Sequence, residues 1–310
     1  KFLNALVQGI DFENRTVFTS DGDEPFDYLV IALGADTFPE KIPGFLEAAY
    51  NLYDLSGAER IREAIETFDK GRIVVLVSSV PFKCPAAPYE AALLLSAYFS
   101  EKRRHVDIEV VTPELLPMGV TGPDVGNTVV SLIQSKGIRF TPQHQAVKID
   151  PAKKEIALED RKTMSYDLLI GIPPHGPPPV LEGSPILAES GWVKVNPRTL
   201  ETDIEGVYAI GDATAIPLSV GKPLPKAGVF AHFQAEVVAH NLKAKIRGAS
   251  PDKEFDGRGY CFIELGDGRA GYASGDFYAE PKPVVNLKKP GRLRHWEKVL
   301  FEKWWLWRWF

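Results

Sequence analysis

The sequence predicts an α/β fold built on parallel sheets, and two observations carry this prediction. An apolar run at residues 72–78 is followed by an Ala- and Leu-rich helical segment after Cys84 and by a second apolar run at 106–112. A strand, a helix and a strand in this order form a βαβ unit, whose strands lie parallel. The apolar run at 26–35, FDYLVIALGA, is nearly continuous, which is typical of a strand buried on both faces.

The other elements are expected in sequence order from their apolar periodicity. Before residue 150 we expect two short strands between residues 5 and 19, helices at about 56–69 and 123–136, and a strand at 138–140. After it we expect a β-hairpin around DPAKKE and a strand at 167–172. Beyond residue 250 the pattern changes to short β segments rich in glycine, and the last sixteen residues form a further segment.

The composition is that of an ordinary globular chain. The 310 residues are 45% hydrophobic and 25% charged, which is enough for about two domains with sizeable cores. The net charge of −5 lacks the basic excess of a nucleic-acid binder. Two cysteines cannot form a disulfide framework, and no apolar run approaches the roughly 18 residues that span a bilayer. No metal site is predicted.

The turn between the first strand and the helix of the βαβ unit lacks the glycines of a dinucleotide site. A nicotinamide-binding unit places G-x-G-x-x-G here, which lets a pyrophosphate approach the helix N-terminus. The turn from Ser78 to Pro85 contains Lys83 and Cys84 but no glycine. Hydride transfer from a nicotinamide is therefore disfavoured. A thiol at a helix N-terminus beside a lysine favours the thiolate, although a lone cysteine is more often a small core residue.

Three further segments have features of a ligand site, although each alone is compatible with an ordinary connection. The segment 206–214, GVYAIGDAT, is a short apolar strand that ends in Gly-Asp. A glycine there lets the backbone approach a ligand, and an acid at a strand end can bind hydroxyl groups. FDYLVIALGA leaves its strand through Gly34, and a Pro-Pro-His loop follows the strand at 167–172.

In this order and spacing, FDYLVIALGA and GVYAIGDAT resemble segments of the two-dinucleotide-domain flavoproteins of the pyridine nucleotide–disulfide oxidoreductase superfamily. CPAAPYEAA, DLLIGIPPH, LPKAGVFA and GYCFIELGDGRA are similar to segments of sulfide:quinone oxidoreductases and of the flavoprotein subunit of flavocytochrome c sulfide dehydrogenase. The resemblance covers essentially the whole chain. It implies a tandem Rossmann-like fold with FAD as the cofactor. The family's opening G-x-G-x-x-G, which holds the ADP half of FAD, does not precede Lys1, so we expect a fragment of a longer protein.

The resemblance also implies the domain organisation and the residues that bind FAD. It assigns 1–54 and 166–250 to the FAD-binding domain, 55–165 to a second Rossmann-like domain carrying Cys84, and 251–310 to a C-terminal segment. The cofactor-binding residues implied are Gly34, Ala35, Pro173, Gly211, Asp212 and Lys226. Asp212 would bind the ribityl chain. Lys226 would stabilise the reduced flavin near its pyrimidine ring, unless it is a surface loop lysine.

Three residues are candidates for catalysis. Sequence distance does not show that Cys84 and Cys261 meet, but the resemblance implies that they form a pair across one face of the flavin. Glu90 follows Cys84 by under two helical turns, near enough to serve the same pocket. By resemblance it accepts the proton of incoming hydrogen sulfide, and the alternative is a solvated helix glutamate. His175 lies either near the flavin or quinone, or in a purely structural loop.

The C-terminal segment HWEKVLFEKWWLWRWF predicts an amphipathic helix at a membrane surface. Trp296, Leu300, Trp304 and Trp307 share one helical face, with Lys303 close enough to snorkel. Tryptophan prefers the bilayer interface, so the segment predicts a monotopic anchor and a peripheral location at a membrane without a transmembrane span. A helix docked on the domain or at a dimer contact is the alternative, and a homo-oligomer is compatible with the sequence.

The function implied is FAD-dependent oxidation of hydrogen sulfide to polysulfide or sulfur through the cysteine pair, with electrons passed to a membrane quinone. Three alternatives stay open. The first is the flavocytochrome c subunit, against which the Trp-rich tail argues because a soluble partner needs no lipid anchor. The second is a type II NADH:quinone dehydrogenase, which the glycine-free turn disfavours. The third is a non-catalytic, flavin-free fragment.

Overall fold

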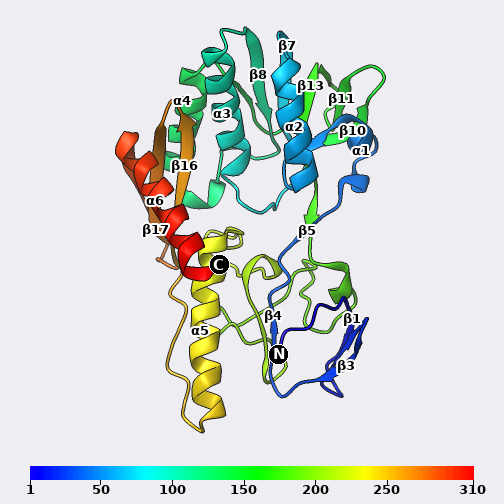
Figure 1. The fold of residues 1–310 in the computed structure, drawn as a ribbon, viewed down its shortest axis with the longest axis vertical. Helices are drawn as coiled ribbons and strands as arrows, with labels where there is room; N and C mark the ends of the chain where they lie inside the picture. The colour runs from blue at the N-terminus through cyan, green and yellow to red at the C-terminus, as the bar shows by residue number, and fades with distance from the viewer. The chain divides into compact units, whose positions relative to one another are not determined.

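The computed structural model describes residues 1–310 and comprises two compact units (Figure 1). Unit 1 contains Lys1–Asp36, Gly176–Arg258 and Glu280–Lys282, and unit 2 contains Thr37–His175, Gly259–Ala279 and Pro283–Phe310. The chain passes from unit 1 to unit 2 within the short strand β5 (Asp36–Thr37) and returns within β14 (His175–Gly176). The predicted α/β class is confirmed.

Unit 2 is built on a five-stranded parallel sheet. Its spatial order is β6 (Tyr50–Asn51), β13 (Leu168–Ile172), β7 (Gly71–Val77), β8 (Val106–Val111) and β9 (Arg139–Thr141). Every pair of neighbours in this sheet is parallel. Helix α3 (Ala87–Glu101) connects β7 to β8, so the predicted βαβ unit is present.

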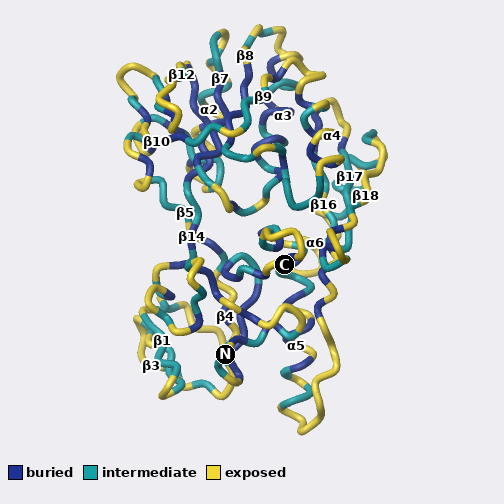
Figure 2. The backbone as a smooth tube through the Cα atoms, turned by 180° about the vertical axis from the view of Figure 1, so that it is seen from behind, coloured by how far each residue is buried: buried dark blue, intermediate teal, exposed yellow.

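The central strand β7 is buried on both faces because each face packs against a different layer. Ile73, Val75 and Val77 pack with α3 and with helices α2 (Leu55–Thr67) and α4 (Pro123–Ser135). Val74 and Leu76 pack on the opposite side with the short helix α1 and an antiparallel meander. These are α1 (Phe45–Ala48), β10 (Ala146–Asp150), β11 (Glu155–Leu158) and β12 (Thr163–Ser165). Figure 2 shows the buried trace along β7 and β8.

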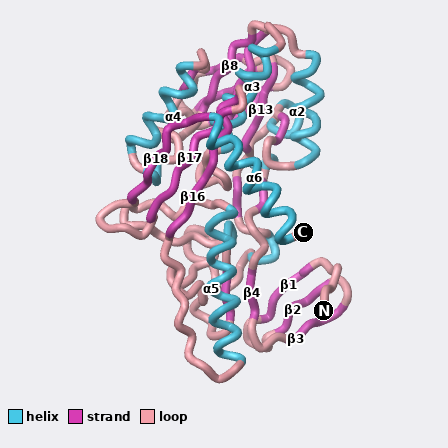
Figure 3. Tube along the Cα trace, turned by 60° about the vertical axis from the view of Figure 1, so that its left-hand side comes forward, coloured by secondary structure: helices cyan, strands magenta, loops and turns pink.

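The C-terminal part of unit 2 is a three-stranded antiparallel sheet followed by one long helix (Figure 3). The elements are β16 (Arg258–Gly266), β17 (Arg269–Asp276), β18 (Val284–Gly291) and α6 (Arg292–Trp309). These strands contain eight or nine residues each, so the expectation of short β segments was wrong. Strands β17 and β18 pair from Ala270 opposite Gly291 to Asp276 opposite Val284, which is nearly their whole length.

Strand β16 presents opposite side chains to two helices. Ile263 and Leu265 join the core around α3. Tyr260 and Phe262, on the other face of the strand, contact Phe301 of α6, with ring centroids 5.9 and 6.2 Å apart. This alternation follows from the two-residue period of a strand and places Cys261 on the same face as Ile263.

Unit 1 contains an antiparallel meander, a two-stranded parallel pair and a long helix. They are β1 (Val7–Asp11), β2 (Thr16–Thr19) and β3 (Gly22–Pro25), then β4 (Leu29–Ile31) paired with β15 (Val207–Ala209), and α5 (Gly228–Ile246). Strand β4 is shorter than the predicted run at 26–35, because β15 offers only three residues as partners. Short 3₁₀ turns in unit 1 are η3 (Pro179–Leu181) and η4 (Gly211–Ala213), and those in unit 2 are η1 (Pro39–Lys41) and η2 (Gly119–Thr121).

None of these helices is both long and apolar enough to cross a lipid bilayer. In α6 the charged residues are distributed along the helix, and the aromatic residues gather toward its C-terminal half.

Candidate active site

Cys84 lies in the turn between β7 and α3, three residues before the first helical residue. Its φ of 50° is in the left-handed region, which few residues other than glycine adopt. Two hydrogen bonds hold its carbonyl oxygen, from the N–H of Ala87 at 2.9 Å and from the Tyr53 hydroxyl at 3.1 Å. The backbone is therefore anchored in a conformation that turns the chain sharply into the helix.

Cys261 lies on β16, within electrostatic reach of Cys84. Both residues are exposed to solvent, and they are not joined in a disulfide. The chain between them includes most of unit 1, and the packing of β16 beside α3 places both segments in the same part of unit 2.

The surroundings of Cys261 favour its neutral thiol. Although part of the residue reaches solvent, the protein around the sulfur desolvates it and raises the pKa to about 12. The nearby Cys84 and Glu90 raise the pKa further, because a second negative charge opposes the thiolate, while Lys298 lowers it. The Cys261 thiol is therefore protonated at neutral pH.

Glu90 belongs to a cluster of four polar side chains beside the cysteines, which we call the carboxylate–lysine cluster (Glu90, Glu264, His295 and Lys298). Glu90 is on the first turns of α3, and its Oε2 accepts the backbone N–H of Glu264 at 3.0 Å. Lys298 Nζ lies 3.3 Å from Glu90 Oε1 and 3.6 Å from Glu264 Oε1. His295 Nδ1 donates to the Glu264 carboxylate at 3.0 Å.

Three members of this cluster were not among the residues that the sequence predicted. His295 and Lys298 are three positions apart in RHWEK, which places them on one face of α6. This spacing indicates that both side chains face the same neighbour. The apolar face of the same helix gives a stronger pattern in the sequence.

The loop that carries Pro173 and His175 also lies in unit 2. Pro173 is buried, and its carbonyl lies 2.9 Å from His175 Nδ1. The His175 ring meets the Tyr53 ring edge-on, with centroids 5.0 Å apart. Tyr53 thus contacts both this loop and the turn that carries Cys84.

In unit 1, the other predicted residues follow the carboxyl ends of two neighbouring strands. Gly34 and Ala35 come after β4, and Gly211 and Asp212 come after β15. Because β4 and β15 are parallel, these ends lie at the same edge of the pair. This edge is where open α/β sheets bind their ligands.

Lys226 is buried against this edge in unit 1. Its Nζ donates to the carbonyl oxygens of Asp212 at 2.7 Å and Thr214 at 2.9 Å, and lies 3.4 Å from the centre of the Trp192 ring. Desolvation lowers the pKa of Lys226 to about 8, while the Asp212 charge raises it. The expectation of a surface loop lysine is therefore excluded, since only 5% of the residue is exposed.

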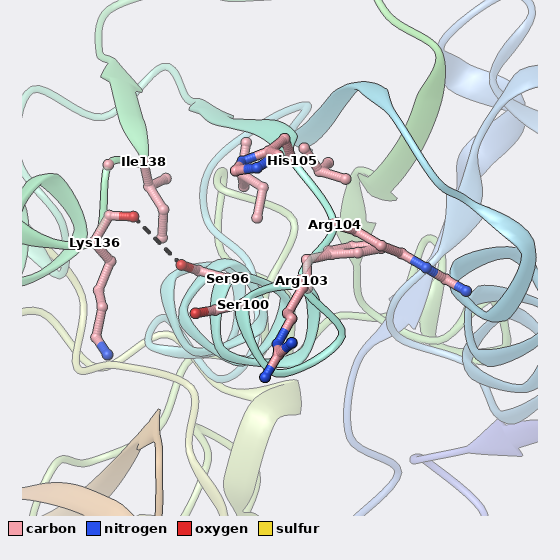
Figure 4. A pocket seen from close by; sticks show the side chains of 11 residues that line it. Ser96, Ser100, Arg103, Arg104, His105, Lys136 and Ile138 are labelled. Atoms are coloured by element: carbon pink, nitrogen blue, oxygen red, sulfur yellow. Dashed lines mark hydrogen bonds between the residues drawn. The ribbon is translucent and has the colours of Figure 1, made fainter.

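A hollow of about 400 Å³ lies elsewhere in unit 2, where α3 and α4 end (Figure 4). Its basic side chains are largely occupied by the protein itself. Arg104 donates to the carbonyls of Ile65, Glu66 and Phe68, and Lys136 pairs with Asp267. None of the predicted site residues lines it.

The family model for pyridine nucleotide-disulphide oxidoreductases matches residues 1–235 of this chain. The chain belongs to this family. The mitochondrial sulfide:quinone oxidoreductase of Mus musculus is 26% identical over 294 residues, which cover 91% of this chain and 64% of the mouse protein. The type II NADH:quinone oxidoreductase of Staphylococcus haemolyticus is 26% identical over 292 residues, which cover 86% of this chain and 71% of the Staphylococcus protein.

Among solved structures, the sulfide:quinone oxidoreductase of Aquifex aeolicus superposes with a TM-score of 0.84 at 25% identity. The match covers 99% of this chain and 75% of the Aquifex chain. The predicted resemblance and the tandem Rossmann-like class are therefore confirmed. This chain spans 64% of the length of the mouse relative.

Members of this family are FAD-binding flavoproteins. The edge formed by β4 and β15 fits a part of this cofactor. At Gly34, whose φ is 72°, a side chain would meet no protein atom within 4 Å, so the backbone there is open to a ligand. With FAD bound, Asp212 in η4 would offer an acid to the hydroxyls of the ribityl chain, and Lys226 would offer a buried cation.

Proposed function

We propose that this chain is the greater part of a sulfide:quinone oxidoreductase that works through Cys84 and Cys261. The observation that carries the proposal is that Cys261 is affected by the charges of Cys84, Glu90 and Lys298, which come from segments far apart in the sequence. The turn of Cys84 is the place where a nicotinamide-binding unit would carry its glycines, and the mouse and Aquifex relatives are sulfide:quinone oxidoreductases by name.

The first chemical step is thiol–disulfide exchange at the oxidised cysteine pair. Hydrosulfide attacks one sulfur of a Cys84–Cys261 disulfide, so one S–S bond forms and one breaks. One cysteine then carries a persulfide and the other is released as a thiolate, with no net change in electrons. A second sulfide takes the outer sulfur of the persulfide and leaves as hydrogen disulfide, the shortest polysulfide.

Glu90 takes the proton in this step. Hydrogen sulfide must lose a proton before it attacks. Glu90 is near enough to Cys261 for its charge to raise the pKa of that thiol. The reduced pair must then lose two electrons and its protons to return to the disulfide. Bound FAD supplies the two-electron acceptor for this return.

The electrons leave to a quinone at a membrane surface, according to this proposal. Tyr260 and Phe262, which flank Cys261, form an aromatic group with Phe301 and Tyr272. Flat apolar rings of this kind suit a quinone ring. On α6, the side chains of Trp296, Leu300, Trp304 and Trp307 are 50–80% exposed, which suits insertion into the lipid interface.

The test is a set of three variants: Cys84→Ser, Cys261→Ser and the double change. We expect each to lower sulfide-dependent quinone reduction by at least about a thousandfold, with the double variant no worse than either single one, because residues that act as a unit do not add. Flavin content and thermal stability are the controls, since serine is close in size to cysteine. A Cys261→Ser protein with near-normal activity would exclude the paired mechanism.

A further inference from the structure

We propose that Lys298 of α6 is a positioning residue of the cysteine site, and that it holds Glu90 toward the thiols and offsets its negative charge at Cys261. This proposal deepens the proposed function and rests on it for its catalytic meaning. It assigns to α6 a role in the chemistry that is separate from lipid binding.

Lys298 is a partly buried side chain that forms ion pairs within unit 2. Its ammonium group lies between two carboxylates, 3.3 Å from Glu90 and 3.6 Å from Glu264. The side chain is 30% exposed, and its two partners are 23% and 11% exposed. An ion pair at this depth is screened by solvent far less than a surface pair.

The position of Lys298 follows from three elements. Glu90 extends from α3 and Glu264 from β16, and the backbone N–H of Glu264 binds Glu90, so the two carboxylates are fixed close together. Helix α6 then supplies Lys298 and, one turn earlier, His295, which binds Glu264. Helices and strands other than α6 thus leave the Glu90 and Glu264 carboxylates side by side. Lys298 of α6 supplies the positive charge that stabilises this pair.

The charged and titratable groups around Cys261 decide how easily it ionises. Cys84 from the turn and Glu90 from α3 both oppose a second negative charge, and Lys298 from α6 favours it. Glu264 lies 3.6 Å from Lys298, and His295 pairs with Glu264. Without Lys298, the Glu90 carboxylate would face Cys261 with no cation beside it, and it would also be repelled by Glu264.

The ionisation of Cys261 can be followed without sulfide, flavin or quinone. The chain has two cysteines, so a Cys84→Ser protein has a single thiol, whose rate of alkylation by iodoacetamide reports its thiolate fraction. In that background, Lys298→Met should slow alkylation at pH 9 by about tenfold, the effect of losing one nearby opposite charge. Lys298→Arg should restore the rate to within about twofold.

Two further variants make the result specific. Lys303→Met removes the same charge from an exposed position of the same helix and should leave the alkylation rate unchanged. Glu90→Gln should act in the opposite direction and speed alkylation, because it removes an anion from Cys261. Circular dichroism would show whether Lys298→Met folds poorly. If it does, the faster alkylation expected for Glu90→Gln still tests the proposal.

The proposal is overturned if Lys298→Met matches the Lys303→Met control, or if Glu90→Gln fails to speed alkylation. The outcome is independent of the proposed function. Inactive Cys→Ser variants with an unchanged Lys298→Met alkylation rate would retain the cysteine mechanism and reject the role of Lys298. The reverse result would retain Lys298 as the charge partner of a thiol that is not catalytic.

Discussion

Cys261 combines access to solvent with an environment that resists its ionisation, and this combination has a measurable signature. With the pKa raised to about 12 by desolvation and by Cys84 and Glu90, the thiolate fraction should rise about tenfold for each pH unit from 7 to 10. In the Cys84→Ser protein, which loses the Cys84 contribution, we still expect the alkylation rate to rise without a plateau over this range. A plateau near pH 9 would show that the thiol is ordinary.

A second residue, Glu109, stabilises the sheet of unit 2 rather than the site. It is 3% exposed on β8, and its carboxylate accepts hydrogen bonds from Arg72 at 2.6 Å, Arg139 at 2.9 Å and Thr141 at 2.6 Å. We expect Glu109→Ala to lower the free energy of unfolding by about 3 kcal/mol, since it leaves a partly buried Arg72 without its carboxylate. Urea denaturation measures this, and Asp107→Ala, at an exposed position of the same strand, is the control, with a change below about 0.5 kcal/mol.

The pH dependence of this contribution has a defined sign. Burial alone would raise the pKa of Glu109, but the hydrogen bonds from Thr141, Arg72 and Arg139 lower it overall. A carboxyl whose folded pKa is lowered stabilises the protein above its unfolded pKa, near 4.5, and this stabilisation is lost as the pH falls through the folded value. The difference between the wild type and Glu109→Ala should therefore shrink below pH 4.5, and a difference that grows on acidification would contradict the ion-pair explanation.

At the scale of one element, α6 has two faces with different tasks. Leu300 and Trp304 are 63% and 50% exposed, whereas Lys298 and Phe301 point to the rest of unit 2. Leu300→Ser combined with Trp304→Ser should weaken binding to lipid vesicles by at least about tenfold, because each apolar side chain contributes roughly 1.5–3 kcal/mol when it leaves water. Co-sedimentation with vesicles of neutral lipid measures this binding.

These substitutions separate lipid binding from the cysteine site better than removal of the helix does. A truncation after Arg294 would also delete His295 and Lys298, which contact Glu264 and Glu90. The Leu300→Ser/Trp304→Ser protein should keep the alkylation rate of Cys261, and Glu302→Gln serves as an exposed control on the same helix. Unchanged sedimentation of the double variant would exclude α6 as the anchor.

At the scale of the whole molecule, the choice of electron donor distinguishes two functions found among the relatives. The turn of unit 2 from Ser78 to Pro85 has no glycine to receive the pyrophosphate of a nicotinamide. We expect sulfide to bleach the flavin absorbance of the flavin-loaded protein at least about a hundredfold faster than NADH does, as measured by stopped-flow mixing. Rapid bleaching by NADH would instead assign the type II NADH dehydrogenase function.

The sequence predicted the parallel core well and the site only in part. The strands β7, β8 and β13 were located from their apolar runs because burial on both faces leaves a continuous signal. The end of β4 was not predicted from the sequence, since the length of a strand depends on its partner. The pairing of Cys84 with Cys261 is implied by family resemblance alone and stays a prediction. Lys298 was not predicted, because an ion pair between α3, β16 and α6 has no local pattern in the sequence.

The separation of Cys84 and Cys261 along the chain has a consequence for biosynthesis. The ribosome delivers β7, the turn and α3 long before it delivers β16, and domains fold largely in the order in which they emerge. Cys84 therefore spends an interval on a nascent unit 2 that contains neither Cys261 nor Lys298. During that interval the Cys84 thiol is accessible and can exchange with oxidised glutathione or with another disulfide, which forms a mixed disulfide on Cys84 and releases a thiol. Pulse-labelled ribosome-bound chains that end before β16 should carry such mixed disulfides on Cys84, whereas finished chains should carry far fewer.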